Sequence, residues 1–425
     1  MDVRTVADLS PAERRAFFDR DAGVGAVRDD VSDIVGRVRE EGDVALREFS
    51  EEFDGVTVGN IDITDDAERA HAELDDADDP VFDAICEAAA NIRAFHERQR
   101  PDDWRETFGD RELGRRFRPL DRAGAYVPGG SAAYPSSALM GVIPATVAGV
   151  GHVSVATPPA EDLNPVTLAA IHEAGADAVY QVGGAQAIAA LAYGTETVTN
   201  AQKVVGPGNK WVTAAKAVVQ GDVEIDFLAG PSEVLVLADE TADPDLVAAD
   251  LVAQAEHDPN ASVVAVTDDE NLADAVSEAV EAQAAGRERE ETIRAALDND
   301  ASGVLNARSV PEAVLFAEDY AAQHLSIVAA DDEALLSRIT NAGSVFLGPY
   351  SPVAAGDYAA GTNHVLPTNG GAKRYGGLSV DTFLRSSTVQ RLDRDALDDL
   401  SGTITGLAEA EGLEAHAESV RKRFE

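Results

Sequence analysis

Stretches of continuous apolar residues alternate with amphipathic stretches along most of this chain, in two successive runs. The apolar stretches predict buried strands at 152–157, 178–182, 203–205, 233–238, 262–267, 303–306, 324–329 and 343–347. The amphipathic stretches predict helices at 164–174, 185–193, 210–220, 244–257, 269–298, 310–322 and 331–340. Strands that alternate with helices through short connections predict parallel sheets covered by helices on both faces. We therefore expect an α/β fold.

Helical patterns also stand at both ends of the chain, outside these runs. Residues 1–22 read as a short helical piece that starts at Ser10-Pro11-Ala12-Glu13. Two helices are predicted within 27–53 and another at 80–100, and the tail from about residue 393 is helical. The loop 348–377 is rich in Gly, Pro, Asn and Ser, and such long loops are usually functional or disordered.

Length and composition limit the class of protein. The 425 residues suffice for two or three domains with their own cores. No apolar run reaches the ~20 residues that span a bilayer, and the N-terminus lacks the cationic start and apolar core of a signal peptide. We therefore expect a soluble cytoplasmic protein. The single cysteine, Cys86, excludes an internal disulfide and a zinc site built on thiolates.

The net charge of the chain indicates a need for salt in the solvent. The chain has 34 Lys and Arg against 77 Asp and Glu, a net charge of −43, and the acids are spread over the whole length. Diffuse acidity of this kind indicates a solvated surface, similar to the Asp-rich, Lys-poor surfaces of proteins from halophilic, salt-accumulating cells. Salt would screen the self-repulsion. The same charge disfavours binding to nucleic acid or to an anionic membrane.

Two glycine-rich strand-to-helix turns, at 183–186 and 206–209, are candidate sites for an anionic ligand on helix N-terminal amides. Neither has the G-x-G-x-x-G dinucleotide fingerprint, and for each turn alone a plain tight turn is the favoured interpretation. Asp243 and Pro244 predict the start of the helix at 244–257.

Gln254 and His257 are three residues apart, so they share one face near the end of that helix. A favourable interaction of His257 with the helix dipole is the ordinary interpretation, and a metal or catalytic role is the alternative.

The eight histidines divide into two groups. No specific role is expected for those on helical surfaces or at a strand start: His71, His96, His152 and His172. Others lie at element ends or in the long loop: His257, His324, His364 and His416. With the carboxylates Asp357, Glu256 and Glu411, the second group is a plausible set of ligands for zinc or a similar divalent ion.

Seven motifs occur in an order that matches one known family. They are Tyr-Val-Pro-Gly-Gly (126–130), Val-Gly-Gly-Ala-Gln-Ala-Ile-Ala-Ala-Leu-Ala (182–192), Gly-Pro-Gly-Asn (206–209), Ala-Gly-Pro-Ser-Glu-Val-Leu-Val (229–236), Gln-Ala-Glu-His (254–257), Gly-Asp-Tyr-Ala-Ala-Gly-Thr-Asn-His-Val-Leu-Pro-Thr (356–368) and Ala-Glu-Gly-Leu-Glu-Ala-His (410–416). From about residue 20 to the end, the chain resembles the L-histidinol dehydrogenases. That family oxidises L-histidinol through L-histidinal to L-histidine with NAD and one zinc ion per subunit, the last steps of histidine biosynthesis.

The resemblance implies a role for each matching residue. The zinc ligands would be Gln254, His257, Asp357 and His416, and the NAD contacts would be Tyr126, Gln186 and Asn209. Ser232 and Glu411 would contact the substrate, together with the zinc ligands and His324, because the metal also takes up the imidazole and amine of histidinol. His324 would be the catalytic base, a task that suits an imidazole. His364 would touch the substrate or a zinc ligand.

The resemblance also implies a domain organisation. We expect two incomplete Rossmann-like parallel-sheet domains with small helical N- and C-terminal extensions. Residues 1–22 would be the N-terminal extension, 23–125 and 233–378 the first domain with most metal and catalytic residues, and 126–232 the NAD-binding domain. The helical tail 379–425 would complete the site of the partner subunit in a homodimer.

One residue departs from the family pattern. Glu-His is usual at the catalytic histidine, whereas this chain has Gln323-His324. Two other readings are a zinc hydrolase acting on a small imidazole or amine compound and a catalytically impaired homologue that only binds ligand. Retention of Tyr126, Gln186 and Asn209 argues against both.

Overall fold

A computed structural model of the chain describes residues 1–20, 23–129 and 133–425. The last two residues of the expected N-terminal extension, and Gly130 and Ser131 of the glycine-rich turn after Tyr126, lie outside the described residues. The chain forms two compact units. The first unit is Met1–Gln99 with Asp121–Phe383, and the second unit is Arg100–Leu120 with Leu384–Glu425.

Among the described residues, one sheet of the first unit has six parallel strands in the order β1-β11-β10-β9-β12-β13. Their bounds are β1 Val3–Thr5, β9 Glu233–Ala238, β10 Ser262–Thr267, β11 Gly303–Asn306, β12 His324–Val328 and β13 Ser344–Leu347. All residues of β9, β10 and β12 are buried, as their continuous apolar sequences require of strands covered on both faces. The expected parallel sheet is confirmed here.

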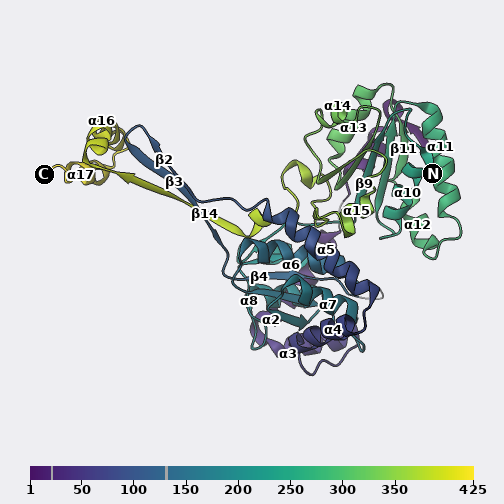
Figure 1. Cartoon of the computed structure of the whole chain (residues 1–425), viewed down its shortest axis with the longest axis horizontal. Coiled ribbons are helices and arrows are strands. Elements are labelled where there is room, and N and C mark those ends of the chain that lie inside the picture. Colours follow the sequence, from purple (N-terminus) through teal and green to yellow (C-terminus); the bar gives the residue numbers. More distant parts are fainter. Residues whose placement is uncertain (21–22, 130–132) are drawn as a thin grey trace. The chain divides into compact units, whose positions relative to one another are not determined.

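Helices cover both faces of this sheet, as Figure 1 shows for α11 and α12 on one side and α13 and α14 on the other. The helices are α1 Pro11–Phe18, α10 Pro244–Ala255, α11 Glu270–Ala284, α12 Glu290–Leu297, α13 Val310–Tyr320, α14 Asp332–Leu336 and α15 Val353–Tyr358. The single helix expected at 269–298 is two helices, because the chain turns at Gly286, whose φ is +74°. Strand β1 was not expected in the N-terminal piece.

The second sheet of the first unit has five parallel strands in the order β6-β5-β4-β7-β8. They are β4 Ala123–Tyr126, β5 Val153–Thr157, β6 Ala178–Gln181, β7 Lys203–Val205 and β8 Glu224–Ile225. Four helices belong to its strand–helix alternation: α6 Pro135–Ala148, α7 Pro165–Ala174, α8 Gly184–Tyr193 and α9 Lys210–Val219.

Four further helices pack around this five-stranded sheet: α2 Val24–Glu41, α3 Asp43–Phe49, α4 Thr64–Asp76 and α5 Pro80–Glu97. A π-helical turn, η2 Ser50–Asp54, follows α3. Helix α2 packs on α8 and α9, α4 on α7, and α5 on α6. This packing differs from the expected grouping of residues 23–125 with 233–378. The structure differs because the apolar face of α2, including Val31 and Val38, is buried against residues such as Ile188.

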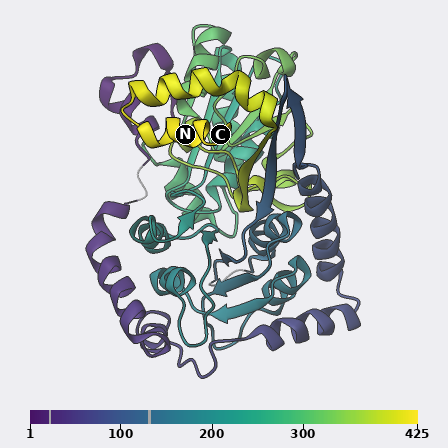
Figure 2. The ribbon, with the colours of Figure 1, turned by 90° about the vertical axis from the view of Figure 1, so that its left-hand side faces the viewer.

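The second unit contains an antiparallel sheet in the order β14-β3-β2, with β2 Trp104–Phe108, β3 Arg111–Pro119 and β14 Leu384–Leu392. Helices α16 Arg394–Ala410 and α17 Glu414–Arg421 follow, and Figure 2 shows them side by side in yellow. The tail from 379 is therefore not wholly helical, since it begins with a 3₁₀ turn and β14. No helix within the described ranges is long and apolar enough to cross a membrane.

Candidate active site

The expected catalytic pair lies at the amino-terminal edge of the six-stranded sheet. His324 begins β12, and Ser232 immediately precedes the neighbouring strand β9. The strand order reverses between these two strands, and ligands in open α/β sheets usually bind at such a point, outside the carboxyl ends of the strands. Here the candidate residues lie at the same switch point but at the opposite edge.

The chain connectivity explains why other candidates reach this edge. Helix α10 runs from the carboxyl end of β9 back toward the start of β10, so Gln254 in its last turn returns to the amino-terminal edge. His257 lies two residues past the end of α10, which is shorter than the helix expected at 244–257. The long loop after β13 returns to this edge as well. The Gly230 N–H donates to Thr368 Oγ1 at 2.6 Å.

His324 is held by a hydrogen bond at one ring nitrogen, and its other ring nitrogen faces a carboxylate. Its Nδ1 lies 3.1 Å from the carbonyl oxygen of Glu233, and its Nε2 lies 3.4 Å from Asp357 Oδ1. A carbonyl only accepts hydrogen bonds, so Nδ1 carries a proton, and in the neutral form of the ring the lone pair is therefore at Nε2. The ring is 3% exposed. A histidine with this tautomer is able to accept a proton from a substrate hydroxyl.

Gln323 is also buried, and its Oε1 accepts a hydrogen bond from the Glu233 N–H at 2.9 Å. Its amide has no group that accepts a proton near neutral pH.

Three residues of the first unit have polar atoms that suit a metal. Within the described ranges, Gln254 Oε1 and Nε2, Asp357 Oδ1 and His324 Nε2 are buried without a hydrogen-bond partner. Such atoms are costly unless something satisfies them, and oxygen and imidazole nitrogen are zinc ligands. The residues therefore fit a divalent cation.

The electrostatics of the site favour the protonation states that metal ligands need. Burial lowers the pKa of His257 and of His364, so both rings are neutral near pH 7. Burial acts to raise the pKa of Asp357, but the neighbouring imidazoles, His324 foremost, outweigh it, and the pKa stays below its usual value. The carboxylate is therefore ionised near the neutral rings of His257 and His364.

The expected ligand set is divided between the two units. His416 lies on α17 and Glu411 at the end of α16, both in the second unit, whereas His257 and Asp357 lie in the first. Over the described part of the chain, no group of three or more His, Cys, Asp or Glu side chains is placed to hold a metal. The first unit supplies only two such residues to the set, besides the amide of Gln254.

His364 contacts the backbone of an expected ligand. Its Nδ1 lies 2.9 Å from the carbonyl oxygen of Asp357, and its Nε2 lies 3.4 Å from Ser137 Oγ. The neighbouring Asn363 donates to the Met140 carbonyl at 2.8 Å. These contacts tie the long loop to α6 and hold the helix that carries Asp357.

The expected cofactor residues gather at the carboxyl edge of the five-stranded sheet, where its strand order reverses between β4 and β7. Tyr126 ends β4 and accepts a hydrogen bond from the Gly184 N–H at 3.2 Å. Gln186 lies buried in the first turn of α8. Asn209 caps α9, with Oδ1 accepting from the N–H groups of Trp211 and Val212. Burial raises the pKa of Tyr126 to about 12, so its phenol is neutral.

The glycine-rich turn after β7 approaches this tyrosine closely. Gly206 has φ +111°, and a Cβ there would lie 2.2 Å from the Tyr126 carbonyl oxygen. The buried pair Lys216–Asp226, with Nζ and Oδ1 2.7 Å apart, fixes the turn. Lys216 donates to the Gly206 carbonyl at 2.5 Å, and Asp226 accepts from the Gly206 N–H at 2.9 Å.

Comparison with known proteins identifies the family. A family model described as histidinol dehydrogenase matches residues 19–424. The chain belongs to the histidinol dehydrogenase family. It is 77% identical to the histidinol dehydrogenase of Haloarcula marismortui and 72% identical to that of Halobacterium salinarum, in each case over 100% of both chains. The crystal structure of the histidinol dehydrogenase from Elizabethkingia anophelis is similar, with a TM-score of 0.92 and 37% identity over 100% of this chain and 97% of that one.

Family membership confirms the resemblance read from the seven motifs, and with it the assignment as an oxidoreductase of histidine biosynthesis. The chain is a histidinol dehydrogenase. Sequence reasoning overlooked Glu233, whose backbone contacts both Gln323 and His324. The available signal was a glutamate placed at the start of the apolar strand Val-Leu-Val-Leu.

Proposed function

We propose that the chain oxidises L-histidinol through L-histidinal to L-histidine with NAD as oxidant, in the cytoplasm. The observation that carries this proposal is the buried His324, with Nδ1 bonded to a carbonyl and Nε2 directed toward Asp357. In the alcohol step, Nε2 of His324 accepts the hydroxyl proton while the carbinol carbon loses a hydride. NAD, when bound, accepts that hydride.

Zinc is the proposed metal, one ion per subunit, held by Gln254, His257, Asp357 and His416. The unsatisfied polar atoms of Gln254 and Asp357 support this set. A bound ion would orient the imidazole and amine of the substrate. Ser232 and Glu411 are proposed to contact the substrate, because a carboxylate suits its ammonium or imidazole N–H.

The test of the proposed function is the rise in NADH absorbance on mixing the protein with zinc, NAD and histidinol across a series of salt concentrations. We expect a rise that needs high salt, because a net charge of −43 repels itself at low ionic strength. Folding is followed in parallel by circular dichroism. No rise from folded protein at any salt concentration would favour a zinc hydrolase or an impaired homologue.

The Gln323→Glu variant is expected to oxidise histidinal about tenfold faster or more, following the usual scale of general-base catalysis. Water must be activated in the aldehyde step, and glutamine holds water without accepting its proton. The variant is fed histidinal directly, with histidinol oxidation as the internal control, which should survive because His324 remains. An unchanged or lower aldehyde rate would assign the base to another group, with Glu256 and His324 as candidates.

The cofactor is proposed to lie over Tyr126, Gln186 and Asn209, with its phosphates at the turns of 183–186 and 206–209. This proposal rests on the position of these residues at a strand-order reversal, beside the starts of α8 and α9. Lys216 and Asp226 would act indirectly by holding Gly206 in place.

The Lys216→Met variant is therefore expected to raise KM for NAD about tenfold, since displaced binding groups lose much of their effect. It is also expected to lose about 3–5 kcal/mol of stability, because Asp226 would be left as an unpaired buried charge. Lys203→Met is the matched control, because the Lys203 ammonium donates to the Thr382 carbonyl at 2.7 Å. A KM for NAD that changes equally in both variants would contradict the role of Lys216.

A homodimer is proposed because the second unit covers little of its own apolar surface. Its exposed side chains include Trp104, Phe108, Leu407 and Leu413, and three of the four buried apolar residues of α16 and α17 are alanines. An exposed apolar surface of this kind marks an interaction site. A second copy would cover it and bring His416 and Glu411 to the partner's site.

A further inference from the structure

Glu233 is a buried carboxylate at the start of the central strand β9, followed by the apolar residues Val234 to Leu237. Its side chain is 2% exposed. A carboxylate in such a place is unstable unless it is paired and fully hydrogen-bonded. Glu233 meets that condition: Oε1 accepts from Arg20 Nε at 2.8 Å and from the Asn369 N–H at 2.6 Å, and Oε2 accepts from Arg20 Nη2 at 3.1 Å.

Arg20 is held as firmly as the carboxylate that it pairs with. Its Nη1 donates to the Phe17 carbonyl and its Nη2 to the Tyr320 carbonyl at 3.1 Å. The guanidinium carbon lies 3.8 Å from the centre of the Tyr320 ring. The Arg20 N–H donates to Asn369 Oδ1 at 3.2 Å. The ion pair therefore joins the N-terminal segment, the end of α13 and the long loop to the start of β9.

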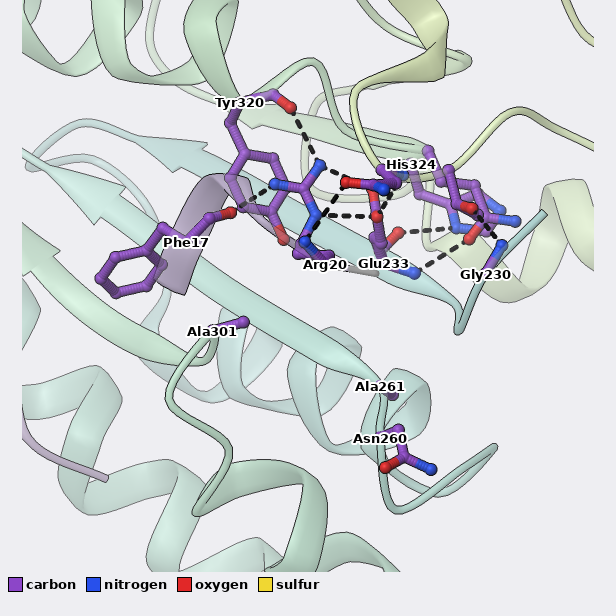
Figure 3. A network of polar contacts seen from close by, with 12 residues as sticks. Phe17, Arg20, Gly230, Glu233, Asn260, Ala261, Ala301, Tyr320 and His324 are labelled. Carbon is purple, nitrogen blue, oxygen red and sulfur yellow. Dashed lines mark hydrogen bonds and ion pairs between the residues drawn. The ribbon is translucent and has the colours of Figure 1, made fainter. Parts of the chain in front are cut away.

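The backbone of the same residue contacts both members of the expected catalytic pair. The Glu233 N–H donates to Gln323 Oε1, and the Glu233 carbonyl accepts from His324 Nδ1. Figure 3 shows the network, with the guanidinium of Arg20 on one side of Glu233 and the ring of His324 on the other. The side chain of Glu233 thus anchors the backbone whose two polar groups hold Gln323 and His324.

We propose that Glu233, paired with Arg20, is a positioning residue that sets the orientation of Gln323 and the orientation and tautomer of His324. The inference rests on the proposed role of His324 as base. If the backbone at residue 233 shifts, the carbonyl that accepts the hydrogen bond from Nδ1 moves away, and Nε2 no longer presents its lone pair at a fixed place. Misplacement by about 1 Å costs as much as 10²-fold in rate.

A charged pair serves this purpose better than apolar packing alone. An apolar side chain at position 233 would fill the space but would make no directional contact with Asn369 or Arg20. The two carboxylate oxygens of Glu233 form hydrogen bonds of fixed geometry with three donors, Arg20 Nε, Arg20 Nη2 and the Asn369 N–H. These bonds limit the movement of the strand end. The ion pair therefore acts on geometry at the reacting edge, apart from any contribution to stability.

The test compares kcat and KM for histidinol, per folded protein measured by circular dichroism in high salt, among single variants. Glu233→Gln replaces one acceptor by an NH₂ group that faces the donors of Arg20 or Asn369. We expect kcat to fall about tenfold or more while KM changes less than about twofold, because orientation of the base is lost and substrate contacts remain. Arg20→Lys, which keeps a cation, is expected to retain more of kcat than Arg20→Met.

Val236→Ala is the matched control, since Val236 is fully buried on the same strand and pairs with Ser326, two residues along β12 from His324. It is expected to lower Tm and to leave kcat per folded protein unchanged. Equal kcat in Glu233→Gln and Val236→Ala, or equal loss in the two Arg20 variants, would overturn the inference.

The proposed role of His324 is tested separately with His324→Asn. If that variant keeps its alcohol oxidation, the role of His324 as base fails and the inference fails with it. If His324→Asn is inactive while Glu233→Gln keeps kcat, only the positioning role is wrong.

Discussion

A mixture of Asp357→Ala and His416→Ala proteins, each inactive alone, is expected to recover about a quarter of wild-type activity once subunits exchange, as the statistics of a twofold dimer require. The reason is the division of the ligand set between the two units of the chain, with Asp357 in the first and His416 in the second. In a hybrid dimer with shared sites, one site carries both substitutions and the other carries none. The measurement is NADH formation after mixing, with exchange followed by differently labelled subunits.

The control for this experiment is a mixture of Asp357→Ala with Gln254→Ala, two ligands that lie in the same unit. Every site in that mixture contains at least one substitution, so no recovery is expected. Demonstrated exchange without recovery in the Asp357 and His416 mixture would mean that each subunit completes its own site.

The His324→Asn variant is expected to lose about 10²–10⁴ in the rate of histidinol oxidation, the usual contribution of a general base. Asparagine keeps a donor for the Glu233 carbonyl but has no group that accepts the hydroxyl proton. KM for NAD is expected to remain near the wild-type value, because the proposed cofactor residues lie on the five-stranded sheet.

The matched control is His152→Asn, since His152 lies just before β5 in the five-stranded sheet, with its Nδ1 4.0 Å from Asp177 Oδ2. Full activity is expected there. If His324→Asn retained the wild-type rate, the base would have to be sought among the other groups at the amino-terminal edge, Glu256 among them.

Much of the local structure of this chain is predictable because it depends on neighbouring residues. Ser10 and Glu13 form the expected capping box at α1, and Asp243 caps α10 ahead of Pro244. The buried strands of both parallel sheets follow from their continuous apolar sequences. These signals act over a few residues, so a single sequence contains them in full.

Pairing between segments that are far apart in the chain is harder to predict from the sequence. Strand β14 is polar and exposed for most of its length, and it pairs with β3 from Leu384 opposite Pro119 to Leu392 opposite Arg111. No short-range signal joins segments so far apart. The expected grouping of α2 with the six-stranded sheet was wrong for the same reason. An apolar helix face indicates that the helix is buried but does not indicate which sheet it packs against.

The candidate site, too, is only partly predictable from the sequence. Motif resemblance named its residues, and the structure places His324 beside Asp357 and Gln323 against the Glu233 N–H. It also shows the contacts of Glu233 with Arg20 and Asn369, which no pattern along the chain displays. A buried glutamate in an apolar strand signals that a partner exists, but the partner is 213 residues away.

That separation has a consequence for the order of folding. The contacts around Glu233 join residues 17–20, 233, 320–324 and 369, so during synthesis they cannot form until residue 369 has left the ribosome. Contacts between distant segments also bear the largest loop-closure cost and form late. Both parallel sheets can acquire much of their helix and strand structure earlier. Catalytic competence is therefore expected to lag behind secondary structure during refolding, and with zinc in excess the part of that lag that does not depend on protein concentration reports the assembly of this cluster.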